Sequence, residues 1–445
     1  MRGAIAAGHP LTAEAGARVL ADGGNAVDAC IAAAFVAAVA EGPLTGPAGG
    51  GFLLVHEPGA ETATVLDCFF GVPSQPLGEM EEILIDFGDS GTQVFHVGEG
   101  SIAVPGLIPG LEEAHRRFGS RPWPELVEPA IELARKGVAR DAPRAFLHGI
   151  LGEILLRTEE GARVYGNPDL VVTGELAETL MRIRDYGTTA VAELVPELGA
   201  DLEAYRVVER APLAADVLGD IVLATPTPSR GGAIVLEILR ALASFDGWKL
   251  DDEARAVSRA YERSPAGALT GTTHISVVDA AGGATGLSST LGSGSGVFRG
   301  GAQLNNMLGE LDVIGPGERQ AGERLPSMMS PTMVLESRRP RLVLGSAGSV
   351  RLAGAIAQVA WRILQGMHVE QAIEAPRIHA EGAKLHLEGG WADDVVRELG
   401  ESWEVVRWVD RNLFFGGVSA VERRSDGSLA AAGDPRRGGA GVVVS

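Results

Sequence analysis

The apolar and polar positions near the start of the chain predict two consecutive helices. In HPLTAEAGARVLADGGNAVDACIAAAFVAAVAEG, the first helix ends at Gly23 and Gly24, which are typical residues at a helix C-terminus. Asn25 then caps a second helix that consists almost entirely of Ala, Val, Ile and Phe. A helix that is apolar on every side must be buried on every side. We therefore expect this second helix to lie between two layers of the fold.

The next part of the chain changes from predicted strands to predicted helices. GPAGGGFLLVHEPG contains a glycine run, a strand and a Pro-Gly turn, and TATVLDCFFGVP is the expected returning strand. Residues 106–137 have a helical pattern that prolines interrupt. Residues 143–263 are rich in Leu, Ala and polar residues, which predicts mostly helix with ATPTPSRGGA as an interrupting loop.

Strand patterns dominate after residue 272. THISVVD and ATGLSST alternate in polarity around the turn AAGG, which predicts a hairpin, and LGSGSG follows as a loop. TMVLE and RLVLG predict a second strand pair, VRLAGAIAQVAWRILQGM a helix, and AVERRSDGSLAAAGDP a last hairpin. Mostly antiparallel sheets that are covered by helices would fit this order of elements.

Composition and charge narrow the classes of partner. The 445-residue chain has a formal net charge of −20, which argues against a nucleic acid or an anionic membrane as its partner. Its 61 glycines indicate tight turns and close backbone approaches. Cys30 and Cys68 lie in apolar contexts, so we expect buried thiols and no disulfide framework. The sequence contains no CxxC or HExxH spacing and therefore offers no metal motif.

The N-terminal sequence MRGAIAAGHPLTAEAG has one arginine and a stretch of small residues that is too short for the core of a signal peptide. The longest apolar run, within residues 29–40, is too short to span a bilayer. From these two features we expect a soluble, cytoplasmic protein without a membrane partner.

Two adjacent threonines, Thr272 and Thr273, follow Gly271 and open a predicted strand. A threonine hydroxyl is a weak nucleophile, but the α-amino group of an N-terminal threonine can act as its base. A free α-amine has a pKa of ~7.7–8.0, which suits proton transfer at cellular pH. Attack of the Thr272 hydroxyl on the unhindered Gly271 carbonyl, an N-to-O acyl shift, could create such a terminus. Alternatively, both threonines simply begin a strand, as β-branched residues often do.

The surrounding stretches resemble the γ-glutamyltranspeptidase family, whose members are N-terminal nucleophile hydrolases made as one precursor. GTTHISVVDAAGGATGLSST resembles the segment that holds the family's processing site. The resemblance covers nearly the whole chain and is weak only over residues 150–261. The other blocks follow in the family's order: GHPLTAEAGARVLADGGNAVDACIAAA, GPLTGPAGGGFLLVH, GLIPGLEEAHRRFG, GVFRGGAQLNNMLGELD, RLPSMMSPTMVLE, LVLGSAGSVRLAGAIAQV, EAPRIHAEG and AGDPRRGGAG.

The resemblance implies an α+β fold, the four-layer αββα sandwich of the N-terminal nucleophile hydrolase type. It also implies autocatalytic cleavage into a large subunit, residues 1–271, and a small subunit, residues 272–445, which stay intertwined as a heterodimer. It implies no cofactor and no metal.

Four residues match the family's catalytic positions. Thr272 matches the nucleophile and new N-terminus, and Gly271 precedes it at the processing site. Thr290 matches the hydroxyl that positions the nucleophile's amine. Gly348 and Ser349 match the pair whose backbone N–H groups form the oxyanion hole, where Ser in place of Gly requires a compatible φ.

Five further residues match substrate-binding positions. Ser327 matches a serine that contacts the donor's α-carboxylate, and Met328 replaces a second serine. Glu310 falls where the family keeps an acid that binds the donor's α-amine, and Asn306 belongs to the same loop. Phe69 stands where typical members carry the arginine that binds the α-carboxylate, and a phenyl ring cannot form that bidentate pair.

Three other features admit a catalytic and a structural interpretation, and we favour the structural one for each. His274 follows the threonines, but the amine-base mechanism does not require it. Residues 292–296, GSGSG, lack the lysine of a phosphate-binding loop and fit a loop that lines the pocket. Asp28 lies inside the apolar second helix, where a carboxylate requires a partner.

We therefore expect an autoprocessed threonine hydrolase or transferase that cleaves γ-glutamyl amides such as glutathione and passes the acyl group to water, an amino acid or a peptide. Phe69 leaves open a different acyl amide, as in acylase and amidohydrolase relatives. A hypothesis from another class is a binding or scaffold homologue that is never processed. The intact GTTH sequence and Thr290 argue against it.

Overall fold

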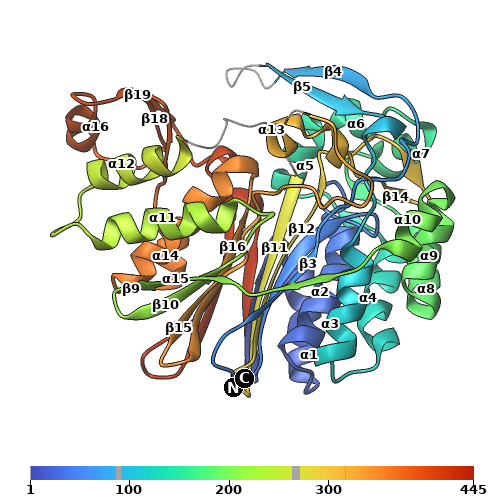
Figure 1. The fold of residues 1–445 in the computed structure, drawn as a ribbon, viewed down its shortest axis with the longest axis horizontal. Helices are drawn as coiled ribbons and strands as arrows, with labels where there is room; N and C mark the ends of the chain where they lie inside the picture. The colour runs from blue at the N-terminus through green and yellow to red at the C-terminus, as the bar shows by residue number, and fades with distance from the viewer. Residues whose placement is uncertain (1, 87–91, 263–270, 316) are drawn as a thin grey trace.

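Two large β-sheets stack face to face between two helical layers (Figure 1). The computed structural model describes residues 2–86, 92–262, 271–315 and 317–445. The first sheet has the order β22-β1-β11-β12-β2-β3-β8. Its strands are β1 (Gly3–Ala7), β2 (Gly50–His56), β3 (Thr64–Cys68), β8 (Val208–Arg210), β11 (Gly271–Asp279), β12 (Ala284–Gly292) and β22 (Ala440–Val444).

The second sheet has six strands in the order β21-β20-β16-β15-β10-β9. Its central strand β16 packs against β11 and β12 of the first sheet, so apolar residues of both inner faces form one core. Its strands are β9 (Leu213–Val217), β10 (Asp220–Ala224), β15 (Thr332–Glu336), β16 (Arg339–Ala347), β20 (Gly417–Arg423) and β21 (Leu429–Gly433). Neighbouring strands pair antiparallel in both large sheets.

One helical layer covers the outer face of each sheet, which gives the four-layer αββα arrangement (Figure 1). The layer over the first sheet includes α1 (Pro10–Ala21), α2 (Ala26–Ala40), α3 (Leu107–Phe118), α4 (Trp123–Lys136) and α8 (Gly174–Tyr186). The layer over the second sheet contains α11 (Gly231–Ala243), α12 (Leu250–Tyr261), α14 (Leu352–Leu364) and α15 (Val369–Glu374).

Shorter elements surround the sandwich. The remaining helices are α5 (Ala142–Ile150), α6 (Gly152–Leu155), α7 (Glu159–Tyr165), α9 (Thr188–Leu194), α10 (Gly199–Ala204), α13 (Leu311–Ile314) and α16 (Asp393–Leu399). The small sheets are formed by β4 (Glu81–Asp86) and β5 (Thr92–Val97), β6 (Val138–Ala139) and β7 (Leu170–Val171), β13 (Phe298–Arg299) and β14 (Ala302–Gln303), and β17 (Ile378–Glu381), β18 (Lys384–Leu387) and β19 (Glu404–Arg407).

Helix α2 confirms the prediction made from its all-apolar sequence, because every one of its residues is buried. The Asn25 side chain accepts hydrogen bonds from the backbone N–H groups of Val27 and Asp28, at 2.9 and 3.0 Å. The Asp28 carboxylate in turn accepts bonds from the Asn25 N–H and from Ser120, whose hydroxyl lies at 2.6 Å. Asp28 therefore has a capping and bridging role, as the structural interpretation expected.

The prediction of mostly helix over residues 143–263 was wrong for residues 208–224, which form strands β8, β9 and β10. β9 and β10 are a hairpin whose two-residue turn, Leu218 and Gly219, has φ values of +57° and +89°. Two-residue hairpin turns require such positive φ values, but the usual signal for them is Asn-Gly or Asp-Gly. Because this hairpin is rich in alanine and has Leu at its turn, its sequence pattern predicted a helix.

Two further observations concern the cysteines and membrane-spanning helices. Both Cys30 and Cys68 are buried free thiols, and burial raises the pKa of the Cys68 thiol to about 12. Within the part of the chain that the structure describes, no helix has both the length and the apolar composition needed to cross a membrane.

Candidate active site

Thr272 lies at an irregularity between the two central strands of the first sheet. Gly271 pairs with Gly292 and Thr273 pairs with Ser289, so Thr272 alone on β11 faces two residues on β12, one of which is Thr290. Such a bulge locally disrupts the ladder and re-aims a side chain. Thr272 is only 2% exposed, yet it borders two pockets.

Thr290 contacts the peptide bond that precedes Thr272. Its hydroxyl donates a hydrogen bond to the Gly271 carbonyl oxygen and accepts one from the Gly292 N–H at 2.8 Å. A hydroxyl that donates to this carbonyl polarises it and stabilises negative charge on its oxygen. Thr290, whose predicted role concerns the amine of Thr272, thus lies at the carbonyl of the same peptide group.

A sharp turn follows strand β16 beside this site. Gly348 has a φ of +122°, and a Cβ added there would lie 2.9 Å from the Gly416 Cα, so a larger residue does not fit. Ser349 then begins a short 3-10 helix that leads into α14. Ala347 before the turn and Leu352 after it each line a pocket together with Thr272. The turn therefore lies, along the chain, between two residues that border different pockets.

The first of these pockets, the apolar pocket, brings five predicted residues together. Its walls are mostly aliphatic, aromatic or thioether side chains. It is lined by Phe69, Thr272, Thr290, Gly292, Met307, Val313, Ser327, Met328, Met329 and Leu352.

Phe69 is fixed in the apolar pocket by other aromatic rings. It stacks on Phe52 with ring centroids 5.3 Å apart and meets Phe70 edge-on at 4.9 Å. The Ser327 hydroxyl accepts a hydrogen bond from the Met329 N–H at 3.1 Å, which leaves its own proton available to a ligand. None of the described residues that line the apolar pocket carries a charge.

Glu310 and Asn306 do not line the apolar pocket and instead hold the loop beside it. The Glu310 carboxylate accepts hydrogen bonds from the Ser293 N–H and hydroxyl, both at 2.9 Å. The Asn306 side-chain oxygen Oδ1 accepts from the N–H groups of Ser293 and Gly294, at 2.7 and 3.1 Å. Burial raises the pKa of Glu310 to about 7. The acid packs against Gly292, which lines the pocket, since a Cβ on Gly292 would lie 3.0 Å from the Glu310 Oε1.

The second threonine of the pair has a structural partner that the sequence analysis missed. The Thr273 hydroxyl donates to the Glu41 carboxylate at 2.6 Å, and the Thr12 hydroxyl donates to the other Glu41 oxygen at 2.8 Å. Glu41 is buried, and this burial raises its pKa. A single acid directly after an apolar helix was the signal that could have identified it. These bonds tie the start of β11 to the end of α2.

The ring of His274 hydrogen-bonds two serines and none of the predicted catalytic residues. Its ring nitrogens hydrogen-bond the hydroxyls of Ser288 and Ser276, at 2.8 and 2.9 Å. Burial lowers the pKa of the imidazole to about 3, so it is neutral at pH 7. The structural interpretation of His274 as a packed, locally bonded side chain agrees with these contacts.

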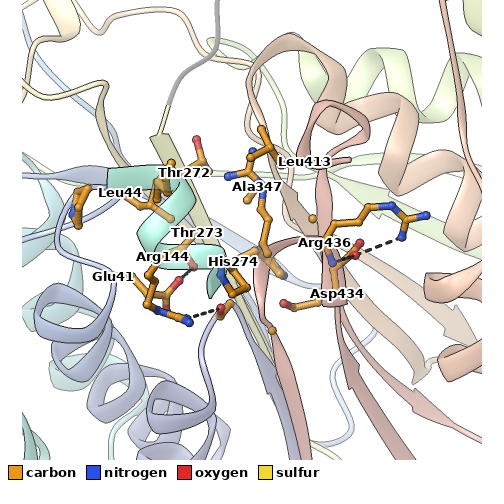
Figure 2. A pocket seen from close by; sticks show the side chains of 18 of the residues that line it. Glu41, Leu44, Arg144, Thr272, Thr273, His274, Ala347, Leu413, Asp434 and Arg436 are labelled. Carbon is orange, nitrogen blue, oxygen red and sulfur yellow. Dashed lines mark hydrogen bonds and ion pairs between the residues drawn. The ribbon is translucent and has the colours of Figure 1, made fainter. Parts of the chain in front are cut away.

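The second pocket, the charged pocket, also borders Thr272 (Figure 2). Unlike the apolar pocket it is bordered by ionisable side chains from α5, from the end of α2 and from the loop before β22. Its charged or titratable residues, apart from His274, are Glu41, Arg144, His148, Asp434, Arg436 and Arg437.

Comparison with known proteins gives relatives that span the whole chain. The glutathione hydrolase proenzyme of Bacillus subtilis (strain 168) is 27% identical, over 100% of this chain and 92% of that protein. The acylase ACY 1 proenzyme of Pseudomonas sp. (strain SE83) is 28% identical, over 100% of this chain and 94% of that protein.

A solved structure and a family model complete the comparison. The crystal structure of cephalosporin acylase from Bacillus halodurans superposes with a TM-score of 0.83 at 20% identity, covering 99% of this chain and 95% of that one, and so shares the fold. The predicted four-layer αββα sandwich is confirmed. The family model described as gamma-glutamyltranspeptidase matches residues 12–264 and 249–444. Since these matches cover almost the entire chain, it belongs to the gamma-glutamyltranspeptidase family.

Proposed function

We propose that this chain is a self-cleaving threonine hydrolase or transferase that acts on amides. Cleavage between Gly271 and Thr272 yields the subunits 1–271 and 272–445. Each subunit contributes strands to both large sheets, so the two remain one intertwined body after cleavage. The relatives named above are proenzymes, which supports such a maturation.

The observation that carries this proposal is the hydrogen bond from the Thr290 hydroxyl to the Gly271 carbonyl. In the cleavage step, the Thr272 hydroxyl oxygen attacks the Gly271 carbonyl carbon, and Thr290 stabilises the negative charge that develops on its oxygen. The C–N bond then breaks, the Thr272 amine receives the proton that the hydroxyl has lost, and an ester joins Gly271 to Thr272. Water hydrolyses this ester and leaves a carboxylate on Gly271 and a free N-terminal threonine.

The mature enzyme repeats the same chemistry on a substrate amide. The α-amine of Thr272 removes the proton of its own hydroxyl, whose oxygen attacks the acyl carbonyl. The backbone N–H groups of Gly348 and Ser349 hold the oxyanion. The amine product leaves with the proton, and water or a second amine then attacks the acyl-enzyme and restores Thr272. The cycle uses only protein groups and requires no cofactor.

Purified protein would test the processing step directly. Denaturing electrophoresis and intact-mass measurement should show two fragments whose masses match residues 1–271 and 272–445. A protein that remains one full-length chain after prolonged incubation, and that cleaves no amide, would instead be the binding or scaffold homologue.

For the acyl group we propose a γ-glutamyl amide such as glutathione, in line with the name of the Bacillus subtilis relative. The second candidate is a different acyl amide, as the names of the acylase relatives suggest. This candidate is favoured by Phe69, since no charged residue of the described chain lines the apolar pocket to bind an α-carboxylate.

Two anilides distinguish these donors. The γ-glutamyl and glutaryl anilides share the chain length and the terminal carboxylate and differ in the α-amine. A kcat/KM at least ten times higher for the γ-glutamyl compound is the expected result. Faster cleavage of the glutaryl compound would overturn the γ-glutamyl proposal and support the acylase candidate.

A further inference from the structure

Phe69, which lines the apolar pocket, lies just beyond the last paired residue of strand β3. The pairing of β3 with β2 ends at Cys68, which lies opposite Gly51. The pairing of β3 with its other neighbour, β8, ends at Asp67. Phe69 is 1% exposed, and buried backbone N–H and C=O groups outside a sheet require other partners. The peptide groups on both sides of Phe69 must therefore be satisfied by other parts of the chain.

Three side chains supply these partners, and we call them the Phe69 frame. The Asp67 carboxylate accepts a hydrogen bond from the Phe69 N–H at 3.0 Å. The Phe69 carbonyl oxygen accepts one from the Tyr205 hydroxyl at 2.5 Å and one from the Arg324 guanidinium at 2.7 Å. The guanidinium also lies 4.3 Å from the centre of the Tyr205 ring and 3.5 Å from the Asp67 carboxylate. The three side chains thus hold one another as well as the backbone of Phe69.

A glycine leaves room for the Tyr205 hydroxyl in this frame. A Cβ on Gly106 would lie 2.5 Å from the Tyr205 Cζ and closer still to its hydroxyl oxygen. Gly106 directly precedes helix α3, and its N–H donates to the Gly49 carbonyl at 3.0 Å. A side chain at position 106 would displace the hydroxyl from the Phe69 carbonyl, so the local sequence is compatible with this contact only because residue 106 is glycine.

The same arginine connects Phe69 to another part of the wall of the apolar pocket. Gly71 forms an antiparallel bridge with Arg324, so the chain after Phe69 lies beside the chain that carries this arginine. Residues 327–329, which also line the apolar pocket, begin three residues after Arg324. The frame therefore fixes the place of Phe69 relative to residues 327–329.

A cavity borders the frame, and we call it the rear cavity. It has a volume of about 290 Å³, and Gly71, Tyr205, Arg206 and Arg324 are among the residues that line it. Among the described residues, none lines both the rear cavity and the apolar pocket. Close packing cannot hold a segment on the side where it borders a cavity. Hydrogen bonds to the Phe69 carbonyl are therefore what keeps this segment from shifting toward the rear cavity.

From these contacts we infer that Tyr205 and Arg324 are positioning residues for the choice of acyl group. They hold the Phe69 carbonyl and so fix the ring that would border the acyl group in the apolar pocket. Neither side chain lines the apolar pocket, so both act through Phe69. The inference rests on the proposed function, because it takes the apolar pocket as the acyl site. Loss of a contact in the frame should weaken acyl selection without stopping the chemistry at Thr272.

Two anilides that differ by one methylene group test the inference on the processed enzyme. The donor preferred in the anilide experiment is compared with the homologue whose acyl chain is one methylene longer. The wild type should favour the first by about tenfold or more in kcat/KM, as expected of a fitted pocket. Tyr205→Phe removes only the hydroxyl and should lower this ratio about three- to tenfold.

The two kinetic constants distinguish positioning from general damage. In Tyr205→Phe, most of the loss should be a higher KM for the preferred anilide, with kcat within about threefold of the wild type and processing complete. An unchanged ratio in Tyr205→Phe, or no preference between the two anilides in the wild type, would overturn the inference. So would equal losses in kcat on both anilides.

A double variant shows whether Tyr205 acts through Phe69. Phe69→Leu removes the ring, so a hydroxyl that acts by placing this ring should matter little in that background. Adding Tyr205→Phe to Phe69→Leu should change the ratio less than twofold, because the two residues are coupled. The full effect of Tyr205→Phe in the Phe69→Leu enzyme would show that Tyr205 acts by another route, which would contradict the inference.

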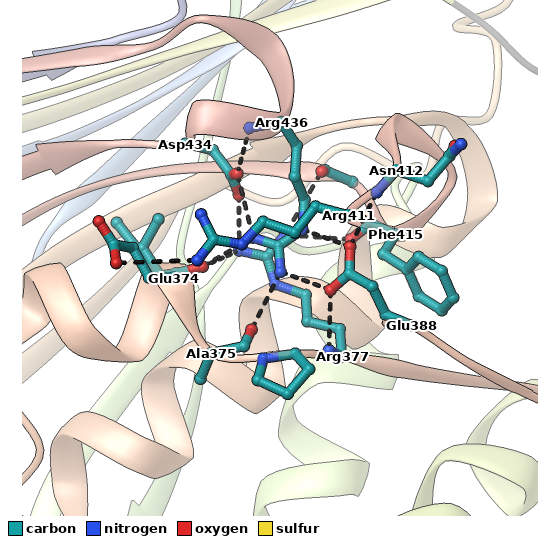
Figure 3. A network of polar contacts seen from close by, with 12 residues as sticks. Glu374, Ala375, Arg377, Glu388, Arg411, Asn412, Phe415, Asp434 and Arg436 are labelled. Carbon is teal, nitrogen blue, oxygen red and sulfur yellow. Dashed lines mark hydrogen bonds and ion pairs between the residues drawn. The ribbon is translucent and has the colours of Figure 1, made fainter. Parts of the chain in front are cut away.

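Matched substitutions control for the loss of a hydroxyl and of a guanidinium. Arg324→Lys keeps the charge but not the planar donor group, so it should lower the ratio as Tyr205→Phe does. Tyr186→Phe changes a tyrosine that is 59% exposed. Arg411→Lys changes an arginine whose half-exposed ion pair with Glu374 spans 3.8 Å (Figure 3). Both controls should keep the wild-type ratio, and a similar fall in either would refute a specific role of the frame.

Amide hydrogen exchange separates this inference from the proposed function, because it requires no turnover. In Tyr205→Phe, peptides that contain residues 67–71 should exchange at least about threefold faster than in the wild type. Peptides from the β11–β12 hairpin should exchange as in the wild type. If the wild type cleaves no anilide, the proposed function fails, and faster exchange at residues 67–71 would still support the frame. Unchanged exchange there would refute it.

Discussion

The two pockets that meet at Thr272 differ in the forces with which they can select a ligand. The apolar pocket is bordered by Phe69, methionines and aliphatic side chains, and its hydroxyls are Thr272, Thr290 and Ser327. The charged pocket has ionisable groups from three separate parts of the chain, and the guanidinium of one of them, Arg437, forms no hydrogen bond or ion pair with the described residues. Shape and apolar contact can therefore select the part of a ligand that enters the apolar pocket, whereas charge can select a part that enters the charged pocket.

Replacing Thr272, which borders both pockets, should have the largest effect on processing and on amide cleavage. Thr272→Ala keeps the β-carbon but lacks the nucleophile, so the protein should remain one full-length chain by electrophoresis. Anilide cleavage should fall on the order of 10⁴-fold or more, as for other catalytic nucleophiles. Thr272→Ser retains a hydroxyl and should still be processed, although more slowly. Cleavage at the same bond in Thr272→Ala would contradict the mechanism.

Replacing Gly348, in the turn after β16, should lower kcat by the next largest factor. Gly348→Ala places a methyl group 2.9 Å from the Gly416 Cα at a φ of +122°, so the turn must shift. We expect kcat to fall about 10²- to 10³-fold, the usual cost of losing an oxyanion-hole donor. Gly366→Ala is the matched control, because Gly366 also has a positive φ but nothing lies within 4 Å of its added Cβ. A normal kcat in Gly348→Ala would show that this turn takes no part in catalysis.

A smaller effect is expected when a polar group is added to the apolar pocket. Met328→Ser introduces a hydroxyl beside Ser327, and this hydroxyl could bind a donor carboxylate. The ratio of kcat/KM for the glutaryl anilide to that for the pentanoyl anilide, which lacks the carboxylate, should rise about two- to tenfold. Met328→Leu keeps the pocket apolar and should leave this ratio unchanged. Equal ratios in both variants would show that position 328 does not face the acyl group.

Sequence patterns predicted the parts of the fold in which local signal and tertiary environment agree. The all-apolar helix α2 could only be a buried layer, and the β11–β12 hairpin alternates in polarity around a glycine turn. Strands β9 and β10 were missed because sheet pairing overrides the helix preference of their alanines and leucines. Strand β22 was missed because it is short and forms an edge whose pairing with β1 depends on a distant segment.

The candidate site shows the same division between local and tertiary signals. Motif resemblance identified Thr272, Thr290, Ser327, Met328 and Phe69, and the fold brings these residues to one pocket. The sequence could not distinguish Arg436 from Arg437, since both belong to one DPRRGG stretch. Which arginine is paired depends on residues 373, 375 and 388, which lie on other elements of the fold.

The smallest expected effect on catalysis concerns Glu310, which packs against Gly292 of the apolar pocket. Its pKa of about 7 exceeds the unfolded value near ~4.3, so the folded state binds the proton more tightly. Its contribution to stability is therefore full below about pH 4.3 and is lost as the pH rises to about 7. Glu310→Gln should abolish this dependence and stabilise the protein above pH 7 by about 1 to 3 kcal/mol relative to the wild type.

Urea unfolding between pH 4.5 and 8 would measure this difference, with Glu323→Gln at an exposed ion pair as the control.

Glu310→Gln also tests whether the Glu310 carboxylate contacts a substrate in the apolar pocket. Because its carboxylate bonds Ser293 behind Gly292, the ratio of γ-glutamyl to glutaryl anilide cleavage should change less than twofold. A tenfold fall in this ratio would instead place Glu310 on the donor's α-amine, so the apolar pocket would contain an acid and the contrast between the two pockets would weaken.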